Sequence, residues 1–333
     1  MQFGLVGSEM CIRDSVLKGF VVRAFVFPGQ GSQAVGMGKR LAEASPTARE
    51  VFEEVDDALG QKLTKLMFEG PQEELTLTAN AQPALMAVSV ALVRTLEKDG
   101  GKRLADGGAY VAGHSLGEYS ALTAAGAIQL ADAARLLRLR GEAMQAAVPV
   151  GEGAMAALLG MELDAAQQVV SDASEIGVCA IGNDNAAGQV VVSGATAAVE
   201  RAVELAKERG VRKAVMLDVS APFHCPLLQP AADAMAEALA TVDIDEPVVP
   251  LIANVTAAPV SDPEEVKRLL VEQVTATVRW RECVLAMKEL GVETLAEMGE
   301  GKVLSGMVRR IDRDMKAMPV QGPEDLESLL AAW

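Results

Sequence analysis

A serine flanked by glycines is the first feature of the sequence that suggests chemistry. Residues 113–117 read GHSLG, and they follow a short apolar run and precede a helical pattern. This order predicts a strand, a sharp turn and a helix, the context in which G-x-S-x-G indicates a nucleophile. The Ser115 hydroxyl would project outward, and the N–H of Leu116 would face an oxyanion formed on an acyl group attached to that serine. The alternative is a turn that merely needs small residues.

Ser115 needs a base, and histidine is the most common one for this task. The sequence contains two histidines. His114 is adjacent to Ser115, so its side chain points to another side of the turn and does not easily reach the hydroxyl. His224, in the proline-flanked segment 220–226, is therefore the candidate base, with a buried structural histidine as the alternative. No acidic residue stands out as the group that would orient His224, so a backbone carbonyl or an amide is expected there.

Arg140 is distinguished by its position on a predicted helix. On a 3.6-residue period it shares a face with apolar residues, and no Asp or Glu of the helix lies on that face. A guanidinium in such a place is costly unless an anion pairs with it. The functional interpretation is a bidentate clamp for a substrate carboxylate. The alternatives are a snorkelling side chain or a pair with a distant carboxylate.

A glycine-rich loop, residues 27–33 (FPGQGSQ), follows a predicted buried strand. Its open backbone and amide side chains suit a second oxyanion donor, for which Gln30 is the candidate. An ordinary surface turn is the alternative. The loop does not match a phosphate-binding P-loop, because Lys39 lacks the required glycine spacing before it and is not followed by Ser or Thr.

The elements that must position these residues follow an α/β pattern starting at Val21. We predict a strand over 21–27, a helix over 80–98, a strand over 109–113, and, after residue 221, a strand over 247–254, helices over 263–274 and 281–291, a strand over 292–299 and a helix over 302–311. Residues 1–20 have no place in this pattern and are interpreted as a non-native leader.

A different pattern occupies residues 151–221. It reads strand, helix, two strands around Asn183-Asp184-Asn185, helix and strand, which is the β-α-β-β-α-β order of a ferredoxin-like unit. The predicted fold class is therefore α/β. A large subdomain would comprise residues 21–150 and 222–333, and residues 151–221 would form an inserted small subdomain.

Composition excludes several classes of function. The 333 residues include 30 Lys and Arg against 46 Asp and Glu, a formal charge of −16, and only 3% are aromatic. Such a chain would repel nucleic acid and anionic membrane surfaces, and it has few side chains for base stacking. Its apolar stretches are shorter than a membrane span requires.

The cysteines and the first residues bear on cofactors and location. Four scattered cysteines without a CxxC pair, and only two histidines, support neither a disulfide framework nor a zinc site. The first 20 residues also lack the features of a secretory signal. We therefore expect a reducing, cytoplasmic environment.

The motifs considered together add a resemblance. FPGQGSQ at 27–33, GHSLGE at 113–118, the Arg140-Gly141 pair and PFH at 222–224 resemble, in order and spacing, the malonyl-CoA:acyl carrier protein transacylases of bacterial fatty acid synthesis. The resemblance runs from Val21 to the C-terminus. It implies an α/β-hydrolase-like large subdomain with a ferredoxin-like insertion. It also implies cofactor-free, ping-pong transfer of a malonyl group from malonyl-CoA to the pantetheine thiol of acyl carrier protein.

The resemblance further implies a role for each candidate residue. Ser115 would be the acylated nucleophile and His224 its general base, oriented by the backbone carbonyl of Gln273. Gln30 and the N–H of Leu116 would form the oxyanion hole. It assigns no role to Asn183 and Asn185, which lie where the small subdomain borders the cleft.

In the same way, Arg140 would bind the malonyl carboxylate.

An esterase or thioesterase of the α/β-hydrolase type is the alternative enzyme, and it would need an Asp or Glu between the serine and the histidine. A carrier-protein docking scaffold is the non-enzymatic alternative. For docking an acidic carrier protein, Arg309, Arg310, Arg313 and Arg212-Lys213 are candidates, with a solvated charged face as the alternative for each.

Overall fold

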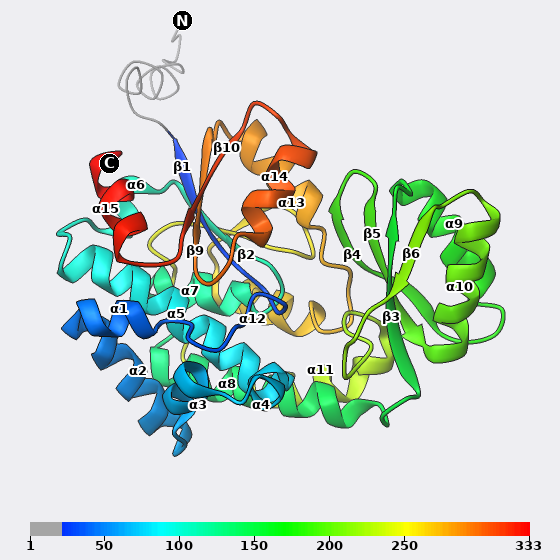
Figure 1. Ribbon diagram of the computed structural model, residues 1–333, viewed down its shortest axis with the longest axis horizontal. Coiled ribbons are helices and arrows are strands. Elements are labelled where there is room, and N and C mark those ends of the chain that lie inside the picture. The colour runs from blue at the N-terminus through cyan, green and yellow to red at the C-terminus, as the bar shows by residue number, and fades with distance from the viewer. Residues whose placement is uncertain (1–21) are drawn as a thin grey trace, which may run out of the picture.

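The computed structural model describes residues 22–333. The leader expected at residues 1–20, and Val21, lie outside the described residues. The chain forms two subdomains, each built on its own β-sheet, and they lie side by side in Figure 1. This arrangement confirms the expected α/β fold class.

The large subdomain contains a six-stranded sheet in the order β10-β9-β1-β2-β7-β8. All neighbours in it are parallel except β7 and β8. Its strands are β1 (Arg23–Phe27), β2 (Tyr110–Gly113), β7 (Leu251–Ile252), β8 (Pro259–Val260), β9 (Thr294–Met298) and β10 (Lys316–Val320). Phe27 and Gly113 are register partners at the ends of β1 and β2. The loops that follow these two strands therefore leave the same edge of the sheet.

Both faces of this sheet are covered, as the side chains of β1 illustrate. Phe25 and Phe27 pack into one hydrophobic cluster, whereas Ala24 and Val26 pack into another. Side chains alternate between the faces of a strand, so a strand covered on both sides reads as a continuous apolar run. That is why this strand could be predicted from sequence.

Most helices pack on the Phe25 side of the sheet. They contribute to its cluster of buried residues and are α1 (Lys39–Ala44), α2 (Pro46–Leu59), α3 (Leu63–Glu69), α4 (Gln72–Thr76), α5 (Thr78–Lys98), α6 (Leu104–Gly107), α7 (Gly117–Ala124), α8 (Leu130–Ala147), α11 (Gln229–Leu239), α12 (Pro263–Glu272) and α15 (Pro323–Ala331). The other face is covered by α13 (Trp280–Glu289) and α14 (Val303–Ile311).

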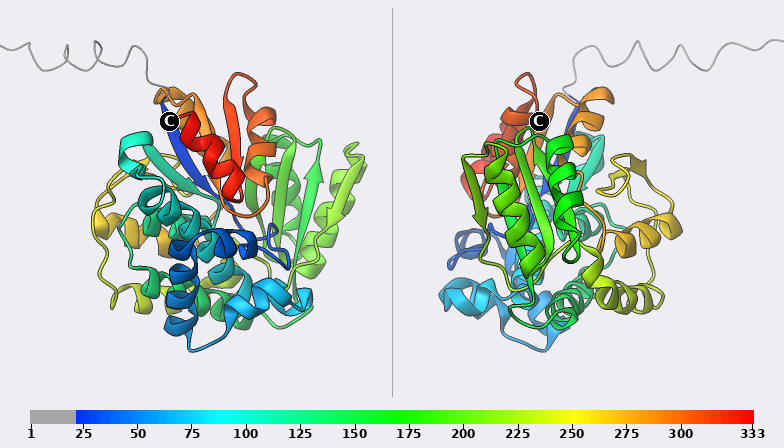
Figure 2. Two further views of the ribbon diagram at one scale, coloured as in Figure 1. Left: turned by 60° about the vertical axis from the view of Figure 1, so that its left-hand side comes forward. Right: turned by 90° about the vertical axis from the view of Figure 1, so that its right-hand side faces the viewer.

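The small subdomain has four antiparallel strands in the order β4-β5-β3-β6. They are β3 (Gly153–Leu159), β4 (Cys179–Ala186), β5 (Gln189–Ala195) and β6 (Lys213–Met216), and the helices are α9 (Leu163–Ala173) and α10 (Thr196–Glu208). Figure 2 (right) shows both helices on one face of this sheet. The chain order is β-α-β-β-α-β. Asn183, Asp184 and Asn185 lie within β4, not between two strands as predicted, and the turn falls after Ala186.

Other predicted elements differ in extent. The strand expected over 247–254 is reduced to β7, because Pro247 and Pro250 cannot donate to a sheet ladder. The helices α11 and α15 and the strand β10 were not predicted. Proline usually argues against a strand, but Pro319 is tolerated in β10 because β10 lies at the edge of the sheet.

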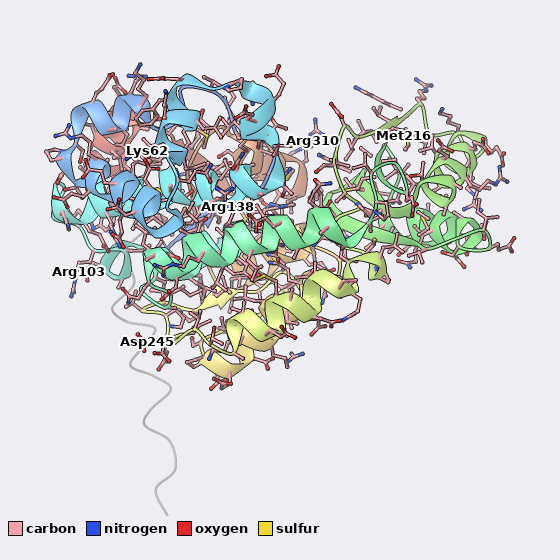
Figure 3. The ribbon with its side chains drawn as sticks, turned by 90° about the horizontal axis from the view of Figure 1, so that it is seen from below. Lys62, Arg103, Arg138, Met216, Asp245 and Arg310 are labelled. Carbon is pink, nitrogen blue, oxygen red and sulfur yellow. The ribbon has the colours of Figure 1, made fainter. Side chains whose placement is uncertain are left out.

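The two subdomains are joined by more than the connecting chain. Figure 3, seen from below, shows the long α8 leading from the large subdomain toward the small one. The backbone of β4 also pairs with Val278 of the large subdomain, since Val278 N–H donates to Gly182 and Asp184 N–H donates to Val278. Arg281 forms an ion pair with the buried Asp184 at 2.9 Å. None of the described helices is long and apolar enough to cross a membrane.

Candidate active site

Ser115 lies on a sharp turn between β2 and α7. Its φ is 55°, a left-handed conformation that non-glycine residues rarely adopt. The flanking glycines are sterically required, because a Cβ on Gly113 would lie 1.9 Å from the backbone carbon of Gly117, and one on Gly117 would lie 2.3 Å from the carbonyl oxygen of Phe27. The turn therefore packs directly against the end of β1 while the serine hydroxyl points into a pocket.

His224 precedes the short 3-10 helix η1 (Pro226–Leu228) and also has a positive φ, 59°. Its Nε2 is 2.7 Å from Oγ of Ser115, and its Nδ1 is 2.9 Å from the carbonyl oxygen of Gln273. A carbonyl oxygen only accepts, so Nδ1 carries the proton and donates it. Nε2 is then left with a lone pair that can accept the serine proton.

The electrostatic surroundings of His224 favour this neutral form. The side chain is buried, at 4% exposure. Burial, together with the positive charge of Arg140, lowers the pKa of His224 to about 3. At neutral pH the imidazole is therefore unprotonated and able to act as a base.

Arg140 projects from α8 into the same place and is only 1% exposed, so its side chain does not snorkel to solvent. Its Nη1 donates to Oε1 of Gln82 at 2.8 Å, and its Nη2 donates to Oε1 of Gln273 at 2.8 Å and to Oγ of Ser115 at 3.2 Å. Within residues 22–333 no carboxylate forms an ion pair with it. Its Nε also has no described partner although it is buried. The guanidinium thus places a positive charge beside the serine without a carboxylate partner among the described residues.

The two oxyanion candidates border the same pocket. Gln30 follows β1, and its side-chain Oε1 accepts from the Thr78 hydroxyl at 2.9 Å. The backbone N–H groups of Gln30 and Leu116 donate to no other described residue. Both residues, with Ser115, His224 and Arg140, line a pocket of about 320 Å³.

Sequence reasoning missed several polar residues that complete this arrangement. Gln82, Glu118 and Asn254 are each 1% exposed or less and hydrogen bond to Arg140, Gln273 or Ser115. Gln82 could have been found by the argument used for Arg140, because it is a polar residue in the apolar part of a helix. Asn254 carried no such signal, since it follows a strand of only two residues.

The remaining histidine and the small subdomain also meet at the pocket. His114 Nε2 lies 2.8 Å from Oδ1 of Asn185, so His114 contacts β4 and not the serine hydroxyl. Asn183 lines the pocket wall. Gln273 directly follows α12, and it contributes its side chain as well as the backbone carbonyl that was expected. The group that accepts from His224 is a carbonyl, whereas the esterase alternative requires a carboxylate.

The described residues hold no other obvious chemical centre. No group of three or more His, Cys, Asp or Glu in residues 22–333 is arranged to hold a metal ion. Cys179, Cys225 and Cys283 are free and buried. The groups available for a reaction are thus a serine, a neutral histidine and a buried arginine, which together would suit acyl transfer through a covalent serine ester and an acyl group that bears an anion.

Comparison with known proteins agrees with this chemistry. Residues 24–321 match the family model described as "Acyl transferase domain". The chain is 48% identical over 305 residues to the malonyl CoA-acyl carrier protein transacylase of Bacillus subtilis, covering 91% of this chain and 95% of that protein. It is 44% identical to the Escherichia coli K12 protein of the same name, covering 92% and 98%.

Solved structures also resemble the chain over most of its length. The acyl-carrier-protein-S-malonyltransferase of Bartonella henselae superimposes with a TM-score of 0.92 at 56% identity, covering 93% of this chain and 99% of that chain. A malonyl-transacylase in complex with its type II PKS acyl-carrier protein gives a TM-score of 0.90 at 41% identity, covering 94% and 100%.

Proposed function

The chain belongs to the acyl transferase family of malonyl CoA-acyl carrier protein transacylases, and on that premise we propose that it moves a malonyl group from malonyl-CoA to acyl carrier protein through a Ser115 ester. The observation that carries the proposal is the 2.7 Å contact between Ser115 Oγ and a His224 whose other nitrogen donates to a carbonyl. The product, malonyl-acyl carrier protein, would supply fatty acid synthesis. We propose that the reaction needs no cofactor and takes place in the cytoplasm.

In the first half-reaction, Ser115 Oγ attacks the thioester carbonyl of malonyl-CoA while its proton passes to Nε2 of His224. The carbonyl oxygen becomes an oxyanion, which accepts from the N–H groups of Gln30 and Leu116. The carbon–sulfur bond then breaks, and the departing thiolate takes the proton from His224. CoA leaves, and the malonyl group remains as an ester of Ser115.

The second half-reaction uses the same groups in reverse. The pantetheine thiol of the carrier gives its proton to His224 and attacks the ester carbonyl. The same two N–H groups stabilise the second oxyanion. When the bond to Ser115 Oγ breaks, His224 returns the proton to that oxygen, so the enzyme ends as it began.

Arg140 would hold the free carboxylate of the malonyl group. Its amide-bound Nη atoms support this role, because the neutral oxygens of Gln82 and Gln273 orient the guanidinium without cancelling its charge. Binding a carboxylate would also give the buried cation a directly contacting anion, which none of the residues 22–333 supplies.

Intact-mass measurement after mixing with malonyl-CoA tests the proposal. We expect a mass increase of one malonyl group, lost when acyl carrier protein is added and absent in Ser115→Ala. An adduct that persists in Ser115→Ala would refute the assignment of the nucleophile. An adduct that water removes as fast as the carrier protein does would favour a thioesterase, and no adduct at all would favour a docking scaffold.

A further inference from the structure

A buried carboxyl group that the proposed reaction does not use lies behind the reacting residues. Glu118 is in the first turn of α7, three residues after Ser115, and is 1% exposed. One carboxyl oxygen, Oε1, accepts from the backbone N–H of Asn254 at 2.5 Å. The other, Oε2, accepts from the side-chain Nε2 of Gln273, also at 2.5 Å.

The first of these partners holds the serine turn. Oδ1 of Asn254 accepts from the backbone N–H of Ser115 at 2.8 Å. Its Nδ2 donates to the carbonyl oxygen of Gly113 at 2.7 Å. Asn254 therefore fixes the backbone on both sides of His114, and Glu118 fixes the backbone of Asn254.

The second partner, Gln273, contacts all three reacting side chains or their backbone. Its Nε2 donates to the Ser115 carbonyl at 3.0 Å, its Oε1 accepts from Nη2 of Arg140 at 2.8 Å, and its backbone oxygen accepts from Nδ1 of His224 at 2.9 Å. The bond to Glu118 also fixes which way the amide points. With Nε2 bound to the carboxyl group, Oε1 is the end that faces Arg140.

We propose that Glu118, as a carboxylate, is a positioning residue that holds Asn254 and Gln273 and, through them, aligns Ser115, His224 and Arg140. Both of its partners are donors, so both oxygens must accept. A protonated carboxyl or a glutamine side chain offers one acceptor and one donor, and one of the two partners would then face a donor. The inference rests on the proposed roles of Ser115, His224 and Arg140. Unlike those three residues, Glu118 would not touch the substrate.

The ionisation state of Glu118 should determine how activity depends on pH. The titratable groups that act on it are Arg140 on α8, Tyr119 beside it on α7 and Cys283 on α13. Burial raises the pKa of Glu118 to about 8, although its two hydrogen bonds and Arg140 favour the carboxylate. The carboxylate therefore forms as pH rises through about 8. Because the pKa of His224 is lowered to about 3, an increase of activity with pH in the neutral range is assigned to Glu118.

The test is the pH profile of kcat/KM for malonyl-CoA, from about pH 6 to about pH 9.5. In the unmodified protein we expect activity to rise with pH. Glu118→Gln should lower activity about 10- to 100-fold at the upper end, the range expected when a partner that orients site residues is lost, and should flatten the profile. Glu118→Asp, which keeps the charge, should retain the rise. A Glu118→Gln protein with unchanged activity and an unchanged profile would overturn the proposal.

Glu297 provides a matched control. It is fully buried at β9, it accepts from the N–H groups of Leu304 at 3.0 Å and Ser305 at 2.7 Å, and burial raises its pKa as well. Glu297→Gln should lose stability in a similar way but keep the pH profile of kcat/KM. If Glu297→Gln flattens the profile as Glu118→Gln does, the effect is one of stability and the proposal fails.

A double-substitution cycle shows whether Glu118 acts through Gln273. Gln273→Ala removes the amide and keeps the backbone carbonyl, so Glu118→Gln should have a much smaller effect in that background than alone. Effects that multiply would contradict the proposal. If Glu118→Gln does not fold, Glu118→Asp takes its place in the cycle: its shorter side chain cannot reach both Asn254 and Gln273, so it should lower the activity while keeping the pH-dependent rise, and lower it less in the Gln273→Ala background.

Intact mass separates this inference from the proposed function. Glu118→Gln should still become malonylated on Ser115, only more slowly. An adduct that survives in Ser115→Ala would refute the proposed function. Normal kinetics in Glu118→Gln would refute the positioning role alone.

Discussion

Nε2 of His224 lies 2.7 Å from Oγ of Ser115 although the two residues are 109 positions apart in the chain, and both have a positive φ. Such backbone conformations are unfavourable for side-chain-bearing residues and persist only where surrounding contacts hold them. Here the contacts are the close packing of Gly113 against Gly117 and the bond from His224 to Gln273. The fold itself thus holds the serine and the histidine at hydrogen-bonding distance.

Because the fold keeps His224 neutral, the free energy of unfolding should depend on pH. Its pKa is lowered to about 3 in the folded protein, whereas an unfolded histidine titrates near 6.5. The unfolded chain therefore binds the extra proton first as pH falls, and the free energy of unfolding should drop below about pH 6.5. The slope for one such group approaches about 1.4 kcal/mol per pH unit.

Urea unfolding between about pH 4 and pH 7.5 measures this effect. His224→Ala should show a weaker dependence on pH than the unmodified protein, whatever its stability at pH 7.5. The buried His114, whose pKa is also lowered by burial, remains in both proteins and cancels in the comparison. Identical pH dependence in the two proteins would show that His224 is not held neutral by the fold.

Arg140 should decide which acyl group is accepted. Arg140→Ala is expected to weaken malonyl transfer by roughly 2 to 5 kcal/mol, the range for deleting one partner of a buried charge pair, while acetyl or longer neutral groups gain relative to malonyl. Lysine should rescue poorly, because a point charge cannot reproduce the planar fork that donates to Gln82 and Gln273. The measurement is the malonyl-to-acetyl ratio of kcat/KM. An unchanged ratio would mean that Arg140 serves the protein structure and not the substrate.

Gly113 should tolerate no side chain. A Cβ there would lie 1.9 Å from the backbone carbon of Gly117, and backbone cannot move away cheaply. We expect Gly113→Ala to reduce the free energy of unfolding by at least about 1 to 3 kcal/mol and to abolish malonylation of Ser115. Thermal unfolding and intact mass test both parts, and normal malonylation of this variant would contradict the close packing of the turn.

Gly306, unlike Gly113, has room for a side chain. It lies on the exposed side of α14, and a Cβ there would meet nothing within 4 Å. Gly306→Ala should therefore raise the free energy of unfolding by roughly 0.5 to 1 kcal/mol and leave activity unchanged, because alanine loses less backbone freedom on entering a helix. A loss of stability would show that this part of α14 is not free to accept a side chain.

Carrier-protein docking should depend on local positive charge, since the chain as a whole is acidic. Arg309 and Arg313 are exposed and line a surface hollow of about 530 Å³ with Lys316. Arg310, also exposed, lies near the boundary with the small subdomain in Figure 3 and donates to Gln189.

Reversal of these charges tests the docking role. Arg309→Glu, Arg310→Glu or Arg313→Glu should raise KM for acyl carrier protein and leave KM for malonyl-CoA nearly unchanged. Arg212 and Lys213, exposed at the start of β6, are tested in the same way. A variant that changes both KM values equally, or neither, removes its residue from the docking surface.

The sequence by itself determined the local parts of this protein. Glycines around Ser115 predict a sharp turn because only residues without a Cβ can pack so closely, and the apolar face that carries Arg140 predicts its burial. The continuous apolar run of β1 likewise predicts a strand covered on both faces. Each of these inferences depends on residues that are neighbours along the chain, so periodicity and sterics suffice.

Only the tertiary structure decided which distant polar groups meet. Glu118, Asn254 and Gln273 come from three separate segments, and no spacing in the sequence relates them. The edge strand β10 was not predicted and β7 was predicted too long, because short strands in segments that contain proline carry little local signal and are defined by the neighbour they pair with. The physical reason is the same in both cases. Hydrogen-bond partners that are far apart in sequence are selected by how the packed elements bring them together, and that selection leaves no periodic pattern in the chain.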